Sequence, residues 1–477
     1  MQVFKQWPIY FIGRILPAAI GFAGLALYTR LLDPGSFGIY ALLLSTAYLI
    51  GTVGYAWIRV SVLRMVASLE GEDEPAYLAT VAGCFALTSL VIFAAVVVIL
   101  RLYQPSLPLA LDALAGGCAL ASGWFELNVT MLQARVNVVG YGLLQFARAL
   151  GTIVCSLLFI HAGLKAAGLL GGFALGNATA LAALREWRPT LRGRFDMEIF
   201  ARIVRFGWPS SASSLSYAAD TFQRYLLDLE WGASAVGIFS AATNLAQQSI
   251  GVFVGTAALA GQPLAFRIRD RGTKEELSAQ LRHNAALVFG VALPAAAGLA
   301  VLAPSVSHLY LGYRFRLDAP LLIAIATSTA LFTGIRGNYF EQAFEIAMNT
   351  RPVAITTGIR SFLTCALSIP LITRFGAVGA AAAVAGSEAL GLAIAIVWAR
   401  RVVHTPIPVM AWLKTTVATA VMVAAILLVP DRLHVAGVIE AFVAGVLAFG
   451  IASALLNLSR VRRLSSRFAL RVQKAWR

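Results

Sequence analysis

Long apolar runs separated by short polar breaks follow one another along nearly the whole chain, from Ile9 to Leu456. About fourteen of these runs reach roughly 20 residues, the length that a helix needs to cross a hydrocarbon core about 30 Å thick. Helices of soluble proteins average only about three turns, so a soluble fold has no need for this length so often. The pattern therefore predicts an all-α, polytopic membrane protein with about 14 transmembrane helices.

The boundaries of the predicted helices follow from where the runs start and stop. The helices fall near residues 9–32, 37–62, 76–100, 108–131, 141–160, 164–184, 207–230, 234–262, 283–303, 317–347, 353–373, 376–398, 409–430 and 435–457. The first run is longer than the core of a signal peptide and lacks a small-residue cleavage site. We therefore expect it to remain as the first membrane helix.

Charge changes the picture by giving the chain an orientation. The sequence is 59% hydrophobic and 13% charged, with a net charge of +16. Most Lys and Arg residues lie in every second break and in the two tails, with clusters at 185–205, 267–282 and 460–477. This alternation is the positive-inside pattern, which predicts that both termini lie in the cytoplasm. The basic charge thus orients the protein in the membrane, and we expect no nucleic-acid partner.

The four cysteines, Cys84, Cys118, Cys155 and Cys365, all lie in apolar runs, without CxxC spacing or a nearby His. Cysteines in this setting usually behave as small buried hydrophobic residues. We therefore expect no metal site, no cofactor and no disulfide.

The chain resembles itself at a spacing of about 200 residues, which is typical of transporters built from repeats. Residues 33–40 recur as residues 232–239, and Trp-Pro opens both the first helix at 7–8 and the seventh at 208–209. Six helices per repeat is an even number, so both repeats cross the membrane with the same polarity. The repeats predict two pseudo-symmetric six-helix bundles that face each other across a central cleft.

The predicted domains follow from this duplication. They are an N-terminal six-helix lobe at 1–190, a basic cytoplasmic linker at 191–206, a C-terminal six-helix lobe at 207–401, two additional transmembrane helices at 402–457 and a cytoplasmic tail at 458–477. Apolar residues recur in the tail at three- and four-residue steps among basic ones. This tail is predicted to be an amphipathic helix that binds anionic phospholipids of the inner leaflet.

Charged residues inside the predicted helices are the candidates for function, because each costs about 2.5–3.5 kcal/mol to insert. Arg14 lies in the first helix, and Asp220 and Arg224 lie at i,i+4 spacing in the seventh. These two helices are equivalent in the duplication, so we expect their charges to face one another across the cleft. A cleft with more Arg than acid favours an anionic ligand, and a lipid diphosphate fits guanidinium forks best.

Purely structural roles are also possible for these charged and polar residues. Asp220 and Arg224 could form a purely structural pair, and Arg30 and Arg59 could reach the membrane interface from helix ends. Asn244 and Gln248 in the eighth helix suit sugar hydroxyls, but amides also bridge helices.

The second half of the tenth predicted helix is polar, with Arg336, Glu341 and Glu345. The two acids could repel an anion, carry a coupling proton or pair with Arg336, and the sequence favours none of these. Arg360 and Glu388 are further isolated charges, and Glu388 joins Glu341 and Glu345 as a possible ion-coupling residue.

Three segments resemble polysaccharide-biosynthesis flippases of the Wzx type, in the multidrug/oligosaccharidyl-lipid/polysaccharide exporter superfamily. They are residues 28–40 (YTRLLDPGSFGIY), residues 205–209 (RFGWP) with the following helix, and residues 374–381 (RFGAVGAA). The resemblance implies two six-helix lobes around a cationic cavity. Carried over onto this chain, Arg14, Arg30, Asp220 and Arg224 would line that cavity.

The resemblance further implies a flippase that moves undecaprenyl-diphosphate-linked oligosaccharide across the bacterial inner membrane, for O-antigen, capsule or exopolysaccharide synthesis. Polysaccharide polymerase and co-polymerase proteins are then candidate partners, and the chain itself is not expected to be an enzyme. The candidate substrate-binding residues are Arg14, Arg30, Arg59, Asp220, Arg224, Asn244, Gln248 and Arg336.

Two other functions stay open. A cation-coupled multidrug exporter would share the architecture but favours an acidic cavity, whereas the first helix holds Arg14 and no carboxylate before Asp33. A polysaccharide polymerase or ligase typically carries a long external loop, and every predicted outward loop here is short.

Overall fold

The computed structural model describes residues 2–66, 73–213, 216–346, 349, 351–403, 405–430 and 432–457. Side chains are described from residue 16 onward, apart from a few positions within the helices. The side chain of Arg14 and the whole of the predicted amphipathic tail at 458–477 therefore lie outside the described residues.

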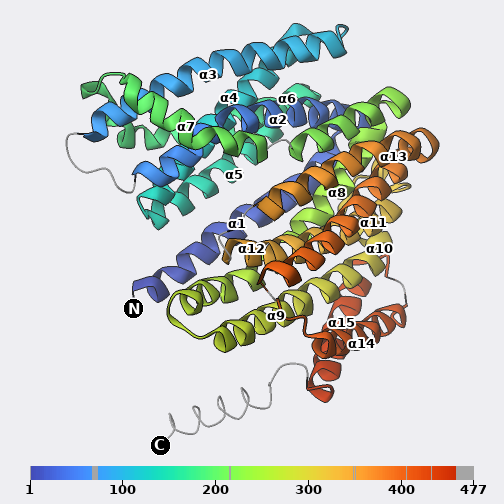
Figure 1. The fold of residues 1–477 in the computed structure, drawn as a ribbon. Helices are drawn as coiled ribbons and strands as arrows, with labels where there is room; N and C mark the ends of the chain where they lie inside the picture. Colours follow the sequence, from blue (N-terminus) through green and yellow to red (C-terminus); the bar gives the residue numbers. More distant parts are fainter. Residues whose placement is uncertain are drawn as a thin grey trace, which may run out of the picture. The chain divides into compact units, whose positions relative to one another are not determined.

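The described part of the chain folds into α-helices joined by short turns, without a β-strand (Figure 1). The α-helices are α1 (Gln2–Leu31), α2 (Pro34–Met65), α3 (Asp73–Tyr103), α4 (Leu109–Ala134), α5 (Val138–His161), α6 (Lys165–Ala178), α7 (Met197–Ser213), α8 (Ser216–Arg271), α9 (Lys274–Val301), α10 (Ala303–Tyr310), α11 (Ala319–Ile335), α12 (Gln342–Ile346), α13 (Arg351–Val403), α14 (Val409–Leu427) and α15 (Val435–Leu455). Three tighter or wider turns complete them: η2 (Thr179–Arg192), η3 (Tyr313–Phe315) and the π-helix η4 (Arg336–Glu341). The prediction of an all-α protein is confirmed.

Nine helical stretches among the described residues are long and apolar enough to cross a membrane. One of them, Arg351–Arg401, contains two of the predicted helices. Many large apolar side chains on these helices are exposed, for example Leu90 and Phe362, as a lipid-facing surface requires. The protein is therefore a multi-pass membrane protein.

Two glycines divide helices that the sequence pattern separates. Gly232 (φ 78°, ψ 170°) interrupts α8 between the predicted helices 207–230 and 234–262. Gly376 (φ 57°, ψ −131°) interrupts α13 at the first residue of the predicted helix 376–398. Both glycines have a positive φ, which L-residues with a side chain rarely adopt. Each break therefore turns one long element into two segments: 216–231 and 233–271 in α8, and 351–375 and 377–403 in α13.

The chain forms two compact units, Met1–Ser240 and Ala241–Arg477. The core of the first unit lies among α2, α3 and α4, around Tyr55, Leu78 and Leu127. The core of the second unit joins α9, α11, η4, α12 and α13 around Tyr339 and Phe344. Because lipid is as apolar as these side chains, close packing rather than escape from water holds such helices together.

The additional helices of the sequence analysis, α14 and α15, pack side by side in the second unit (Figure 1). The first unit also takes in α7 and the first segment of α8, which the duplication assigns to the second repeat. The lobe boundaries at 190 and 207 stay a prediction.

The start of α2 is fixed by its N-cap, Asp33. The Asp33 carboxylate accepts hydrogen bonds from the Ser36 amide (2.9 Å) and the Ser36 hydroxyl (2.7 Å), and Pro34 occupies the first helical turn. Burial raises the pKa of Asp33, but the Ser36 hydrogen bonds and the nearby positive charge of Lys165 outweigh that effect. The pKa therefore lies below its usual range.

Replacing this cap tests its contribution. Asp33→Ala should lower the free energy of unfolding by about 1 kcal/mol, whereas Asp33→Asn, which can also cap, should cost less. Because the pKa of Asp33 is low in the folded chain, its stabilisation is complete above the pKa of an unfolded aspartate, about 3.9, and is lost as the pH falls through the folded-state value. Unfolding of the detergent-solubilised protein between pH 7 and pH 3 measures this. An Asp33→Asn variant with the same acid sensitivity as the parent chain would contradict it.

Candidate functional site

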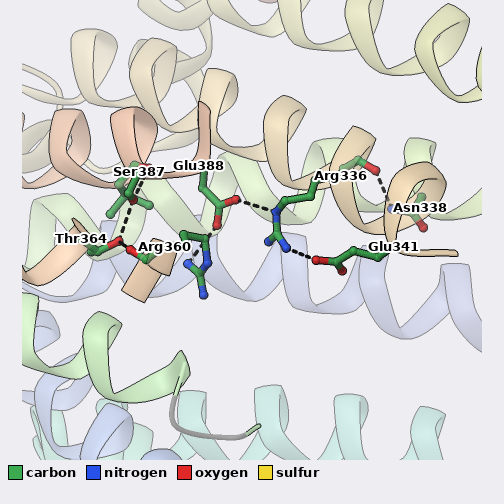
Figure 2. Close-up of polar contacts among 9 residues, drawn as sticks. Arg336, Asn338, Glu341, Arg360, Thr364, Ser387 and Glu388 are labelled. Carbon is green, nitrogen blue, oxygen red and sulfur yellow. Dashed lines mark hydrogen bonds and ion pairs between the residues drawn. The ribbon is translucent and has the colours of Figure 1, made fainter. Parts of the chain in front are cut away.

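Three buried charged residues meet within the second unit (Figure 2). Arg336 begins the π-helix η4, Arg360 lies in the first segment of α13, and Glu388 lies in its second segment. One Glu388 oxygen lies 3.2 Å from Arg336 Nε and the other lies 2.9 Å from Arg360 Nη1. A single carboxylate thus bridges two guanidinium groups that are 24 residues apart in sequence.

A second carboxylate completes what we call the ion cluster: Arg336, Glu341, Arg360 and Glu388. Glu341 accepts from Arg336 Nη1. Arg336, Arg360 and Glu388 are only 7%, 8% and 3% exposed, while the Glu341 side chain is 20% exposed. With two positive and two negative groups, the cluster is formally neutral, which is the condition for holding charges in a low-dielectric interior.

The local backbone explains why these residues meet. Residues five apart do not face each other on an α-helix, where neighbours are three or four apart. The π-helix over Arg336–Glu341 has a wider turn, which brings the two side chains together. In α13, the break at Gly376 folds the second segment back, and Thr364 bonds Ser387 beside the cluster at 2.6 Å (Figure 2).

The structure decides one alternative that the sequence left open. Glu341 pairs with Arg336, while Glu345, one turn further on, is exposed. Asn244 and Gln248 lie half-buried in the second segment of α8. Among the described contacts, neither amide bonds to the ion cluster.

A second group of charges lies inside the first unit. Arg59 of α2 pairs with Glu126 of α4 at 3.4 Å, and both side chains are 34% exposed. Arg59 Nε is buried without a hydrogen-bond partner among the described residues. The guanidinium carbon of Arg148 in α5 lies 4.5 Å from the centre of the Phe125 ring, a cation–π contact next to Glu126. These three charges leave a formal excess of one positive charge.

The other predicted site residues are placed as follows. Arg224 and Asp220 lie half-buried on the first segment of α8, and Arg224 Nη1 lies 3.3 Å from the Asp220 carbonyl oxygen. Arg30 is exposed in the last turn of α1. Because the Arg14 side chain lies outside the described residues, the facing of Arg14 and the Asp220–Arg224 pair stays a prediction.

Sequence reasoning missed three polar contacts. Arg360 was only an isolated charge in the sequence, because a partner 28 residues away across a helix break has no periodic signal. Arg101 pairs at 2.7 Å with Asp112, which is fully buried. A signal for that pair did exist, since the two opposite charges flank the short turn between α3 and α4. Asp228, bonded by Tyr103 at 2.9 Å, had no such signal.

The chemistry of the described side chains does not include a metal centre. Within the described ranges, no three His, Cys, Asp or Glu residues form a group that could hold a metal ion. All four cysteines are free, with Cys84 and Cys118 buried.

The bridging role of Glu388 can be tested against Glu341. Glu388→Gln should lower the free energy of unfolding by about 3–5 kcal/mol. The substitution leaves the buried Arg360 without a carboxylate partner and Arg336 with only one of its two. Glu341→Gln should cost clearly less, because Arg336 keeps Glu388 and Glu341 is partly exposed. Unfolding midpoints of the two purified variants measure this order. Equal midpoints, or a larger loss in Glu341→Gln, would contradict the bridge.

Comparison with known proteins adds the family and the fold. Residues 3–269 match the model of a family described as polysaccharide biosynthesis protein. No curated protein sequence matches the chain. Among solved structures, lipid II flippase MurJ in an inward closed conformation is similar, with a TM-score of 0.77 and 14% identity, over 94% of this chain and 98% of that one.

Two transporters are similar as well. An inward-facing multidrug resistance MATE family transporter of the MOP superfamily has a TM-score of 0.69 and 16% identity, covering 83% of this chain and 98% of its own. A MOP superfamily transporter from Pyrococcus furiosus has a TM-score of 0.51 and 16% identity, covering 83% and 94%. At these identities the similarity shows a shared fold, that of flippases and transporters.

Proposed function

Because this chain belongs to the polysaccharide biosynthesis protein family, we propose that it is a flippase for undecaprenyl-diphosphate-linked oligosaccharide. It moves this substrate across the bacterial inner membrane by alternating access, for O-antigen, capsule or exopolysaccharide synthesis. The fold that it shares with lipid II flippase MurJ supports this proposal. The positive-inside pattern supports an inner-membrane orientation with both termini in the cytoplasm.

The observation that carries the proposal is the excess of guanidinium over carboxylate in the first unit. Arg59 keeps an unsatisfied Nε–H beside its single carboxylate partner. Arg148 is held over an aromatic ring, with no ion pair among the described residues. A guanidinium group presents a planar fork of N–H donors that binds phosphate oxygens in pairs. Arg148 can therefore offer its N–H donors to a diphosphate without first giving up a carboxylate partner, while Arg59 shares its charge with Glu126.

The ion cluster of the second unit has a different role in this proposal. Glu341 and Glu388 both form ion pairs with Arg336. Arg336 can therefore bind the substrate only when Glu341 moves away. Glu341, Glu345 and Glu388 are the candidates for ion coupling, and Glu341 is the cluster acid nearer to the surface. Arg14, Arg30, Asp220 and Arg224 complete the proposed anion site, while Asn244 and Gln248 suit sugar hydroxyls.

The proposed partners follow from the same chemistry. Anionic phospholipids complement the basic cytoplasmic breaks and tail. Polysaccharide polymerase and co-polymerase proteins are proposed to receive the translocated oligosaccharide.

A multidrug exporter is the second candidate, because the MATE family transporter shares the fold. A cationic drug needs carboxylates that are free to receive it. In the first unit, however, Asp112 and Glu126 are already paired with Arg101 and Arg59. A drug would have to displace these guanidinium groups, so the anionic substrate is the better match.

Arginine substitutions test the anion site. Arg59→Ala and Arg148→Ala should each reduce export of surface polysaccharide about tenfold or more, because a charge-assisted hydrogen bond to a phosphate is worth about 1.5–3 kcal/mol. Arg59→Lys should restore only part of the loss, because an ammonium cannot form the fork. Export is measured in a strain that carries the variant as its only copy.

The matched control is Arg202→Ala. Arg202 is exposed on α7, where its contact is a helical pair with Glu198, so export should stay near the parent level. Normal export by Arg59→Ala and Arg148→Ala at normal protein abundance would contradict the anion site.

A further inference from the structure

The linker that joins η2 to α7 runs along the first turns of α3, within the first unit. A Cβ added to Gly193 would lie 1.9 Å from the carbonyl oxygen of Pro75, so the two backbones touch there. Three residues further on, the Asp196 amide donates to Thr80 Oγ1 at 3.0 Å. These contacts fix residues 192–197 (RGRFDM), which we call the linker segment, against α3.

Phe195 shows how deep in the membrane the linker segment lies. A Cβ on Gly83 of α3 would lie 2.9 Å from Phe195 Cδ2. The membrane-spanning stretch of α3, Glu74–Tyr103, has 30 residues. It is therefore about 45 Å long, about 15 Å more than the hydrocarbon core. When that excess is shared between the two ends, the first residues of the stretch, about five, lie among lipid headgroups, and Gly83 lies just inside the hydrocarbon.

The exposed side chains of the linker segment combine apolar and basic groups. Phe195 and Met197 are 54% and 70% exposed, and a membrane interface buries such large apolar side chains. Arg192 and Arg194 are exposed on either side of Gly193. Neither arginine forms an ion pair within the part of the chain that the structure describes. Apolar groups at the edge of the hydrocarbon and unpaired guanidinium groups beside them are the features of a lipid-binding segment.

The acids around the linker segment have other partners. The Asp196 carboxylate caps α7 by accepting from the Ile199 amide at 3.0 Å. The remaining acids form ion pairs, which are Glu74 and Glu186 with Arg135, and Glu198 with Arg202. Arg192 and Arg194 therefore keep N–H donors that an anion from outside the protein can accept.

We propose that the linker segment is a binding site for the phosphate of an anionic phospholipid in the inner leaflet. Phe195 and Met197 lie among the acyl chains, while Arg192 and Arg194 reach back to the headgroup layer, as long basic side chains do. Their planar forks donate to phosphate oxygens. Two neighbouring cations favour a lipid with a net negative charge over a zwitterionic lipid, because they repel the cation of the zwitterionic headgroup. The proposal deepens the partnership with anionic phospholipids and rests on the cytoplasmic orientation given under the proposed function.

Fluorescence quenching measures the depth of the linker segment. In a full-length chain without the four native cysteines, Met197→Cys is labelled with bimane and reconstituted in vesicles of equal parts phosphatidylcholine and phosphatidylglycerol. We expect a lipid that is spin-labelled near the top of its acyl chain to quench the bimane strongly, and iodide in the water to quench it weakly. The reverse result would place the segment in water, as a surface for docking a soluble protein would be, and the proposal would be wrong.

The lipid preference tests the two arginines. In the same mixture, brominated phosphatidylglycerol should quench the bimane at least about threefold more than brominated phosphatidylcholine, since each arginine near the surface favours an anionic lipid. Arg192→Gln combined with Arg194→Gln should make the two lipids quench equally. Arg192→Lys combined with Arg194→Lys should keep part of the preference, because the charge remains while the fork is lost. Equal quenching in the parent chain, or an unchanged preference in the glutamine variant, would overturn the proposal.

The matched control is Arg202→Gln, another exposed arginine a few residues away, which pairs with Glu198 on α7. Its lipid preference should stay at the parent value. A comparable loss in this control would show that overall charge sets the preference, and would also contradict the proposal. Because quenching needs no substrate, it separates failure of the lipid site from failure of the flippase proposal. The latter would show as normal surface polysaccharide in a strain lacking the chain.

Discussion

Within a bilayer, a charged side chain must find its compensation inside the protein, and the bridge from Glu388 to two arginines shows how this chain meets that constraint. Arg336 and Arg360 would each be costly alone. Sharing Glu388, with Glu341 as the second acid, makes the group neutral while joining η4 to both segments of α13. The charges are therefore neutralised only because the backbone brings η4 and both segments of α13 together in the second unit.

In the first unit, the charged side chains are compensated in a different way. Arg101 and Asp112 compensate each other, but Arg59 and Arg148 share one acid and an aromatic ring. An aromatic face offers weaker stabilisation than a carboxylate, and it leaves the N–H donors at the guanidinium edge available. The two units thus differ in chemistry: the second holds a neutral ion cluster, and the first holds an arginine that lies against an aromatic ring rather than a carboxylate.

The sequence was informative wherever the signal was periodic or repeated. Apolar length predicted the all-α membrane fold, and the ends of the apolar runs predicted helix boundaries near Gly232 and Gly376, where the helices break. It could not show that Arg336 and Glu341 would meet, because five-residue spacing pairs only on a π-helix. Nor could it show that Arg360 would reach Glu388, because that pairing depends on how two segments of α13 fold back on each other. The hydrogen bond between Tyr103 and Asp228 could not be predicted either, because the two residues lie on helices that are far apart in the sequence.

The repeated motif shows most clearly what separates prediction from structure. Its recurrence at 33–40 and 232–239 indicated duplication. In the structure, Gly38 and Gly237 each lie against the backbone of the other copy of the motif. A sequence repeat gives equivalence of position, whereas contact between equivalent positions also requires an approximate two-fold relation between the copies. Such a relation places the smallest residues where the two backbones come closest.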